Sequence, residues 1–200
     1  LHGLPENLLT PQPGPKDYLA FLGRIAPEKG PDKAIRIARA CGIPLKIAAK
    51  VDKVDEVYFG TVIRPLLAQG GVEMIGEIND AQKPAFLSGA CGLLMPIDWP
   101  EPFGLVMIEA MACGTAVVAS AVGGIPEVVD DGRTGLLVPY DDTDPVGFEA
   151  GLAARIAELL SDPARARRMG AAGRERAVRE FGWAAIAQRT REVYETALAG

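Results

Sequence analysis

The stretch CGLLMPIDWPEPFGLVMIEAMACGTAVVAS (91–120) holds two apolar strands with an apolar helix between them. Residues 91–97 and 115–120 are short apolar runs typical of buried strands, and residues 104–113 predict a mostly buried helix that ends at Gly114. Strands that alternate with helices indicate a parallel sheet. Because these strands are continuously apolar, we expect helices on both faces of that sheet.

The same alternation continues on both sides of this stretch. Further strands are expected at residues 18–23, 45–51, 72–76 and 134–138, and helices at 31–41, 54–69, 81–89 and about 125–130. Asp80 is expected to cap the helix at 81–89. The predicted fold is α/β, a Rossmann-like three-layer sandwich with a six-stranded parallel sheet.

The two ends of the chain differ from this core. Residues 1–17 are rich in Pro and Gly and predict an extended arm or linker. After Pro145 the sequence predicts helices at 146–160, 163–180 and 183–199. The expected division is an arm (1–17), a sheet domain (18–180) and a last helix (183–200).

Composition excludes several classes of protein. The 200 residues are 48% hydrophobic and 24% charged, which suits one sizeable core, and a net charge of −5 argues against a dedicated nucleic-acid binder. With one histidine and only Cys41, Cys91 and Cys113, a zinc site or a disulfide framework is not expected, which favours a reducing cytoplasm. No apolar run reaches the roughly 18 residues of a membrane span, and no signal peptide opens the sequence. Because the chain starts at Leu1, we expect a trimmed or partial chain.

Two cations follow the first expected strand, where ligands bind in open parallel sheets. Arg24 and Lys29 lie in one turn before a helix start, and a guanidinium and an ammonium beside helix N–H groups suit a diphosphate. The alternative is that both are solvated surface charges.

Two carboxylates flank the start of the buried helix. Glu101 precedes it and Glu109 lies inside it, so at 3.6 residues per turn both could line one side of a cleft, where they would accept hydrogen bonds from sugar hydroxyls. The start of this helix, at residues 103–105, could offer N–H groups to a phosphate. Alternatively, Glu101 caps the helix and Glu109 is a surface residue.

Other strand ends carry weaker signals. Lys50, Val51 and Ile78 could form the wall of a base pocket, and Gly123-Gly124 could approach a ligand closely or form a plain turn. The sequence has no G-x-G-x-x-G, no G-x-x-x-x-G-K-[ST] and no G-x-S-x-G, which argues against dinucleotide, P-loop and nucleophile-elbow sites.

Together, GRIAPEKG, GEINDAQK, EPFGLVMIEAMACGTAVVAS and GGIPEVVDDGRTGLLV resemble the carboxyl-terminal half of retaining nucleotide-sugar glycosyltransferases of the GT-B type. These enzymes have two Rossmann-like domains and two glutamates with seven residues between them, here Glu101 and Glu109. The resemblance spans about residues 18–140. It implies that 1–17 is the interdomain crossover and that the last helix returns toward an amino-terminal, acceptor-binding domain.

The resemblance also implies a role for each matching residue. The implied catalytic residues are Arg24 and Lys29, which neutralise the donor diphosphate, and Glu101, which contacts the donor sugar. Backbone N–H groups of Phe103, Gly104 and Leu105 would lie near sugar and phosphate, Glu109 would bind the ribose, and Ile78, Lys50 and Val51 would flank the base.

The expected reaction is transfer of a hexose from a UDP- or GDP-sugar with retention, without a metal or other cofactor, because cations at the leaving phosphates stabilise the departing charge. The loop after the second strand lacks the usual glycine, which leaves UDP, GDP or ADP open. We expect the isolated chain to bind the nucleotide without turnover. The alternatives are a related epimerase or phosphorylase and a non-catalytic nucleotide-sugar-binding module.

Overall fold

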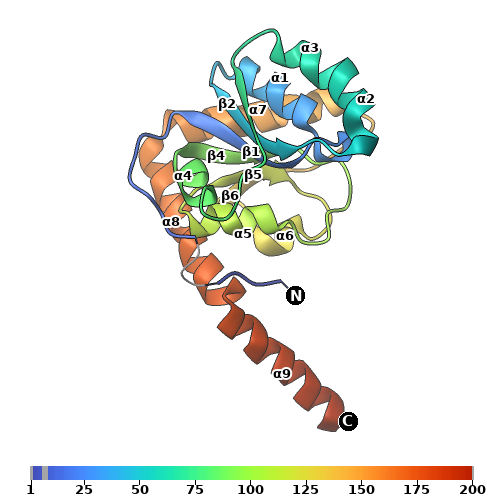
Figure 1. Ribbon diagram of the computed structural model, residues 1–200. Helices are drawn as coiled ribbons and strands as arrows, with labels where there is room; N and C mark the ends of the chain where they lie inside the picture. Colours follow the sequence, from blue (N-terminus) through green and yellow to red (C-terminus); the bar gives the residue numbers. More distant parts are fainter. Residues whose placement is uncertain (1, 6–8, 200) are drawn as a thin grey trace.

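The computed structural model describes residues 2–5 and 9–199, and a parallel β-sheet forms its centre (Figure 1). The strands are β1 (Tyr18–Arg24), β2 (Leu45–Lys50), β3 (Val72–Gly76), β4 (Ala90–Met95), β5 (Val117–Ser120) and β6 (Gly135–Val138). Their order is β3-β2-β1-β4-β5-β6, and the pairing is parallel throughout. The predicted six-stranded parallel sheet is confirmed.

Helices cover both faces of the sheet (Figure 1). One face carries α1 (Pro31–Ala40), which follows the short turn η1 (Pro27–Lys29), together with η2 (Lys53–Asp55), α2 (Glu56–Tyr58), η3 (Phe59–Ile63), α3 (Arg64–Leu67) and α7 (Pro145–Ser161). The other face carries α4 (Lys83–Ser88), α5 (Leu105–Ala112), α6 (Ile125–Val128) and α8 (Pro163–Phe181). The three-layer sandwich is therefore confirmed, and α7 belongs to it.

Alternation along the strands explains their continuously apolar sequences. In β1, Leu19 and Phe21 belong to the core under α1 and α7, whereas Tyr18 and Ala20 belong to the core under α5 and α8. Successive side chains of a strand point to opposite faces, so a sheet with two covered faces needs apolar residues at every position.

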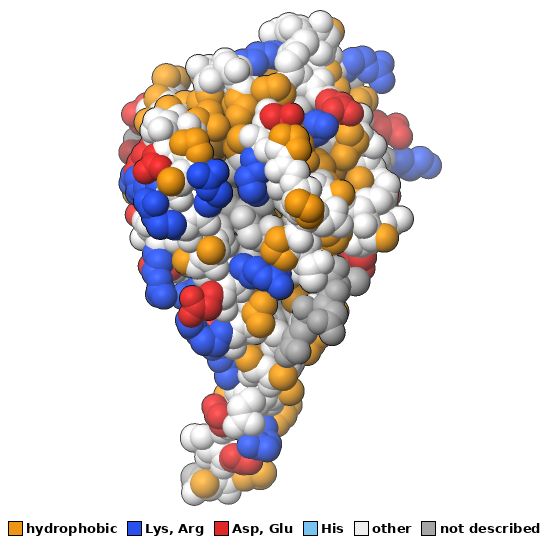
Figure 2. All heavy atoms as spheres, turned by 90° about the vertical axis from the view of Figure 1, so that its left-hand side faces the viewer, with side chains coloured by type: hydrophobic (Ala, Val, Ile, Leu, Met, Phe, Trp, Pro, Cys, Tyr) orange, Lys and Arg blue, Asp and Glu red, His pale blue; other side chains and the backbone are white. Residues whose placement is uncertain are grey.

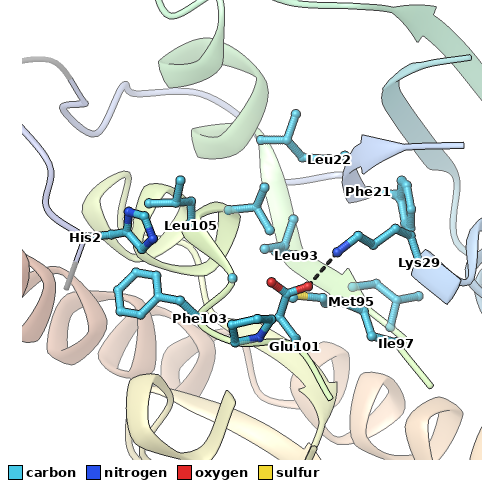
Figure 3. A pocket seen from close by; sticks show the side chains of 15 residues that line it. His2, Phe21, Leu22, Lys29, Leu93, Met95, Ile97, Glu101, Phe103 and Leu105 are labelled. Atoms are coloured by element: carbon cyan, nitrogen blue, oxygen red, sulfur yellow. Dashed lines mark hydrogen bonds and ion pairs between the residues drawn. The ribbon is translucent and has the colours of Figure 1, made fainter. Parts of the chain in front are cut away.

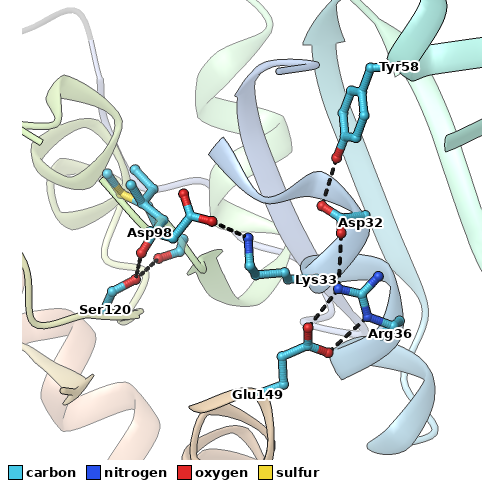
Figure 4. A network of polar contacts seen from close by, with 9 residues as sticks. Asp32, Lys33, Arg36, Tyr58, Asp98, Ser120 and Glu149 are labelled. Atoms are coloured by element: carbon cyan, nitrogen blue, oxygen red, sulfur yellow. Dashed lines mark hydrogen bonds and ion pairs between the residues drawn. The ribbon is translucent and has the colours of Figure 1, made fainter. Parts of the chain in front are cut away.

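A polar network fixes the start of α1 (Figure 4). The Asp32 carboxylate accepts hydrogen bonds from the Tyr58 hydroxyl (2.7 Å) and from the Arg36 guanidinium (3.0 Å). Arg36 also donates to both carboxylate oxygens of Glu149 on α7, at 2.6 and 2.9 Å. These contacts tie α1 to its two neighbours on that face of the sheet.

Two local expectations are wrong. The segment expected as one helix over 54–69 is divided into 3-10, α and π turns, from η2 to α3. Asp80 does not cap the next helix: the Asn79 side chain accepts from the N–H groups of Ala81 (3.0 Å) and Gln82 (3.2 Å), and α4 begins at Lys83. The Asp80 carboxylate instead pairs with the Lys83 ammonium at 2.9 Å, which explains why it is not free to cap.

The described part of the amino-terminal arm packs on the domain. Leu9 is 2% exposed, Leu4 pairs with Gly182 at the end of α8, and the Lys16 ammonium donates to Ser88 O and Ala90 O. Residues 1 and 6–8 of the expected arm, and residue 200 of the expected last helix, lie outside the described residues.

The last helix, α9 (Trp183–Ala199), extends away from the sandwich (Figure 1) and forms the narrow lower end of the molecule in Figure 2. Within its described residues only Ile186 is buried, while Trp183, Val193, Tyr194 and Leu198 are at least half exposed. No helix among residues 2–5 and 9–199 is long and apolar enough to span a membrane.

Candidate functional site

The strand order creates a crevice between β1 and β4. The chain continues from β1 to β2 on one side and from β4 to β5 on the other, so the loops after β1 and β4 separate at the carboxyl edge of the sheet. Open α/β sheets bind ligands at such a switch point. The loop 25–30 and the loop 96–104 meet there.

A hollow of about 350 Å³, named here the β1–β4 hollow, opens at this point (Figure 3). Its walls are the end of β1, the end of β4, Lys29, Glu101 and the start of α5. The Lys29 ammonium lies 2.5 Å from a Glu101 carboxylate oxygen, and their side chains are 21% and 12% exposed. A carboxylate this buried needs a partner, and Lys29 supplies it.

Two glycines after β5 hold the Glu101 backbone. Gly124 N–H donates to the Glu101 carbonyl at 2.7 Å. A Cβ at Gly123 would lie 2.4 Å from that carbonyl oxygen, and a Cβ at Gly124 would lie 2.4 Å from the Pro102 carbonyl oxygen. Gly123-Gly124 therefore allows close approach to the protein's own backbone at Glu101.

A second hollow of about 230 Å³ lies on the β2 side, and it is named here the β1–β2 hollow. Its polar residues are Arg24, Lys50, Glu77, Lys83 and Glu109. The Lys83 ammonium lies 2.7 Å from Glu109, whose side chain is 13% exposed. Burial opposes the charge on Lys83, but hydrogen bonds to Glu109 and Asp80 outweigh it and raise the Lys83 pKa.

The two hollows share a wall formed by Leu22, Gly23 and Val106. The structure thus brings Glu101 and Glu109 to the two sides of one crevice, each beside a lysine. Glu109 is not a surface residue. Glu101 does not cap α5, because Gly104 is the N-cap and α5 has no side-chain cap.

Arg24 and Lys29 are not brought together. Arg24 is about half exposed and pairs with Glu28 (3.2 Å) and Asp52 (3.6 Å) at the rim of the β1–β2 hollow, whereas Lys29 lines the β1–β4 hollow. Gly23 lines both hollows, so the two expected cations belong to adjoining hollows. A ligand that spans both hollows would still meet both charges.

The remaining expected residues differ in position. Phe103, Gly104 and Leu105 line the β1–β4 hollow, and Lys50 and Ile78 line the β1–β2 hollow. The backbone at Gly104 has φ +77°, which turns the loop into the first turn of α5, where helix N–H groups have no partner inside the helix. Val51 instead packs against the core under α1.

Three contacts were not expected from the sequence. Lys83 lies inside GEINDAQK, but nothing local pairs it with Glu109, 26 residues away. The Lys29 ammonium stands 4.8 Å above the Trp99 ring. The His2 ring lies 5.3 Å from that of Phe103, which places the arm at the β1–β4 hollow (Figure 3).

This chain is similar to several proteins of known structure or name. An alpha-maltose-1-phosphate synthase of Mycolicibacterium smegmatis is 43% identical over 185 residues, which cover 90% of this chain and 48% of that protein. A sucrose-phosphate synthase structure from Thermosynechococcus elongatus is 31% identical with a TM-score of 0.81, over 99% of this chain and 52% of the other. The Anabaena protein HepE, solved with UDP and glucose, is 22% identical and shows the same fold, with a TM-score of 0.84 over 97% of this chain and 55% of the other.

The chain spans about half the length of the curated relatives it matches. Residues 10–176 match the family described as Glycosyl transferases group 1, which is most of the chain. These matches include the crevice between β1 and β4 and all of the sheet. The chain belongs to the group 1 glycosyl transferases.

Proposed function

We propose that this chain is the donor-binding half of a retaining glycosyltransferase that transfers a hexose from a UDP- or GDP-sugar. The observation that carries the proposal is the pair of joined hollows around Gly23, each with a buried carboxylate beside a lysine. A nucleotide sugar has hydroxyl groups at both ends and two phosphates between them. Carboxylates suit the hydroxyls, and cations suit the phosphates.

The proposed pose places the ribose in the β1–β2 hollow and the sugar in the β1–β4 hollow. Glu109 accepts hydrogen bonds from the ribose hydroxyls, and Glu101 from those of the sugar. The diphosphate crosses Gly23, with Lys29 on one side and Arg24 on the other, and reaches the N–H groups at the start of α5. Ile78 and Lys50 flank the base.

The proposed chemistry is departure of the nucleoside diphosphate from the anomeric carbon. Negative charge builds on the leaving phosphates, and the fixed charge of Lys29, Arg24 and the α5 amino terminus stabilises it. Positive character builds on the sugar beside Glu101. We assign no nucleophile to the protein, and we propose that the cations remove the need for a metal ion, so that UDP affinity is the same with Mg²⁺ and with EDTA.

We further propose that the acceptor binds to the other half of the full enzyme. The exposed apolar residues of α9, Trp183, Val193, Tyr194 and Leu198, would pack there. On this proposal the present chain binds donor nucleotide and does not turn it over.

Calorimetric titration of the folded chain with UDP, GDP and ADP tests the proposal. At least one should bind, and Lys29→Ala should lower diphosphate affinity by about tenfold to a hundredfold while uridine or guanosine affinity is kept. Lys46→Ala is the matched control, because Lys46 also pairs with a glutamate (Glu73, 3.3 Å) and stands over a ring (Tyr18, 4.6 Å). Lys46 lies near the amino end of β2, away from the carboxyl edge of the sheet where the two hollows open.

Glu109→Gln tests the ribose side. It should weaken the nucleoside as much as the diphosphate, and Glu149→Gln, which breaks an ion pair between α1 and α7, should change neither. No heat with any nucleotide in folded protein would refute the proposal. Equal losses for nucleoside and diphosphate in Lys29→Ala would refute the assigned role of Lys29.

A further inference from the structure

Trp99 lies in the loop between β4 and α5, two residues before Glu101. Its ring faces the Lys29 ammonium at 4.8 Å, and the same ammonium pairs with Glu101 at 2.5 Å. Lys29 is thus held from two sides by the same loop. One contact is an ion pair, and the other is a cation over an aromatic face.

The turn that carries Lys29 is fixed to this loop at two more points. Gly30 packs so closely on Pro96 that a Cβ there would lie 2.4 Å from the Pro96 carbonyl oxygen. The Lys33 ammonium lies 2.7 Å from Asp98, the residue before Trp99 (Figure 4). These contacts therefore hold the loop that carries Trp99 in place against the backbone of Lys29, independently of the Lys29 side chain.

Hydrogen bonding does not explain a tryptophan here. The Trp99 indole nitrogen is buried and has no hydrogen-bond partner among the described residues. A buried donor without a partner destabilises the folded chain. Trp99 packs against the core under α5 and turns a ring face to the Lys29 ammonium, and tryptophan gives the strongest cation–π contact of the three aromatic residues.

We propose that Trp99 is a positioning residue that keeps the Lys29 ammonium in the β1–β4 hollow when a diphosphate binds. The inference rests on the proposed function. Phosphate oxygens compete with Glu101 for the Lys29 ammonium, and sugar hydroxyls compete with Lys29 for the Glu101 carboxylate, so we expect the ion pair between the two to loosen. A ring face attracts the ammonium without using its three N–H donors, so these donors stay free for phosphate oxygens.

The tryptophans themselves supply the test, since the chain contains only two. Trp183 is about half exposed on α9, so Trp183→Phe leaves Trp99 as the sole tryptophan reporter, and pyrophosphate affinity equal to that of wild type checks that the crevice is intact in this variant. Inorganic pyrophosphate, which has no absorbing base, is titrated into this variant. We expect a saturable change in Trp99 emission. This change should be lost when Lys29→Met is added to Trp183→Phe and kept when Lys46→Ala is added instead.

Calorimetry then separates positioning from folding. Trp99→Leu should bind pyrophosphate about tenfold more weakly with unchanged uridine affinity, and Trp99→Phe, which keeps a ring face, should recover most of the loss. Pyrophosphate binding with constant Trp99 emission, or with equal affinity in wild type, Trp99→Phe and Trp99→Leu, would overturn the inference and leave the proposed function standing. If neither pyrophosphate nor any nucleotide binds folded wild type, the proposed function fails as well.

Discussion

Gly123→Ala tests how Glu101 is held in the crevice. The backbone at Gly123 has φ +55°, which a residue with a Cβ adopts at a cost of about 1 kcal/mol. The new Cβ would also lie 2.4 Å from the Glu101 carbonyl oxygen and 2.6 Å from its nitrogen. Such contacts force backbone shifts that cost about 1–3 kcal/mol. We expect a loss of about 3 kcal/mol in the free energy of unfolding.

Gly132→Ala is the matched control. Gly132 also has a left-handed backbone, φ +77°, but a Cβ there would have nothing within 4 Å. It should cost only the conformational strain, about 1 kcal/mol. For a chain of this size each kcal/mol lowers the melting temperature by about 2–4 °C, so the two variants should melt several degrees apart.

The assays are urea unfolding and titration of both variants with a UDP-hexose. Because Gly123→Ala pushes on the peptide of Glu101, the proposed sugar ligand, it should also weaken UDP-hexose binding, whereas Gly132→Ala should leave binding unchanged. Equal free energies of unfolding for the two variants would show that a Cβ close to the Glu101 backbone costs no stability. Full UDP-hexose affinity in a destabilised Gly123→Ala would show that the position of Glu101 does not matter for donor binding.

Three further outcomes follow from groups outside the crevice. Burial raises the pKa of Cys113 to about 11, so at pH 8 about one molecule in a thousand has the reactive thiolate. Iodoacetamide should therefore modify Cys113 in urea but not in buffer, as measured by the mass of the Cys113 peptide. Equal modification rates in urea and in buffer would contradict this. Burial opposes the charge on Asp32, but hydrogen bonds from Tyr58 and Arg36 outweigh it and lower the Asp32 pKa. The free energy of unfolding of the wild type should therefore exceed that of Asp32→Asn by about 1–3 kcal/mol above pH 4, and this margin should shrink as the pH falls through the lowered pKa. A margin independent of pH would refute the role of the charge. Truncation after Gly182 should leave the melting temperature within a few degrees, because Ile186 is the buried residue of α9, and loss of the folded state would show that α9 belongs to the core.

The sheet could be predicted because its signal is local. Each strand is a short apolar run, and a glycine borders each of α1, α4, α5 and α6. Burial on both faces removes the alternation that would otherwise mark an exposed face. The capping prediction failed because neighbouring side chains compete for the same contacts. Asp80 has a good capping side chain, but it pairs with Lys83, and the Asn79 side chain accepts from the N–H groups of Ala81 and Gln82 in the turn before α4.

The site could be predicted only in part, because its contacts join distant segments. The pattern around Glu101 and Glu109 marked the right helix, yet the partners of both glutamates, Lys29 and Lys83, lie 72 and 26 residues away. Arg24 and Lys29 are close in sequence but line different hollows that share Gly23, and only the folded chain shows this.

A crystal structure of the chain with UDP tests the central claim most directly. The account predicts the ribose hydroxyls on Glu109 in the β1–β2 hollow, the phosphates between Lys29, Arg24 and the start of α5, and Lys29 withdrawn from Glu101 but still over Trp99. UDP bound at the opposite edge of the sheet, for example in the hollow lined by Lys16 and Arg167, would contradict it, as would a nucleotide in the crevice with the Lys29–Glu101 pair intact.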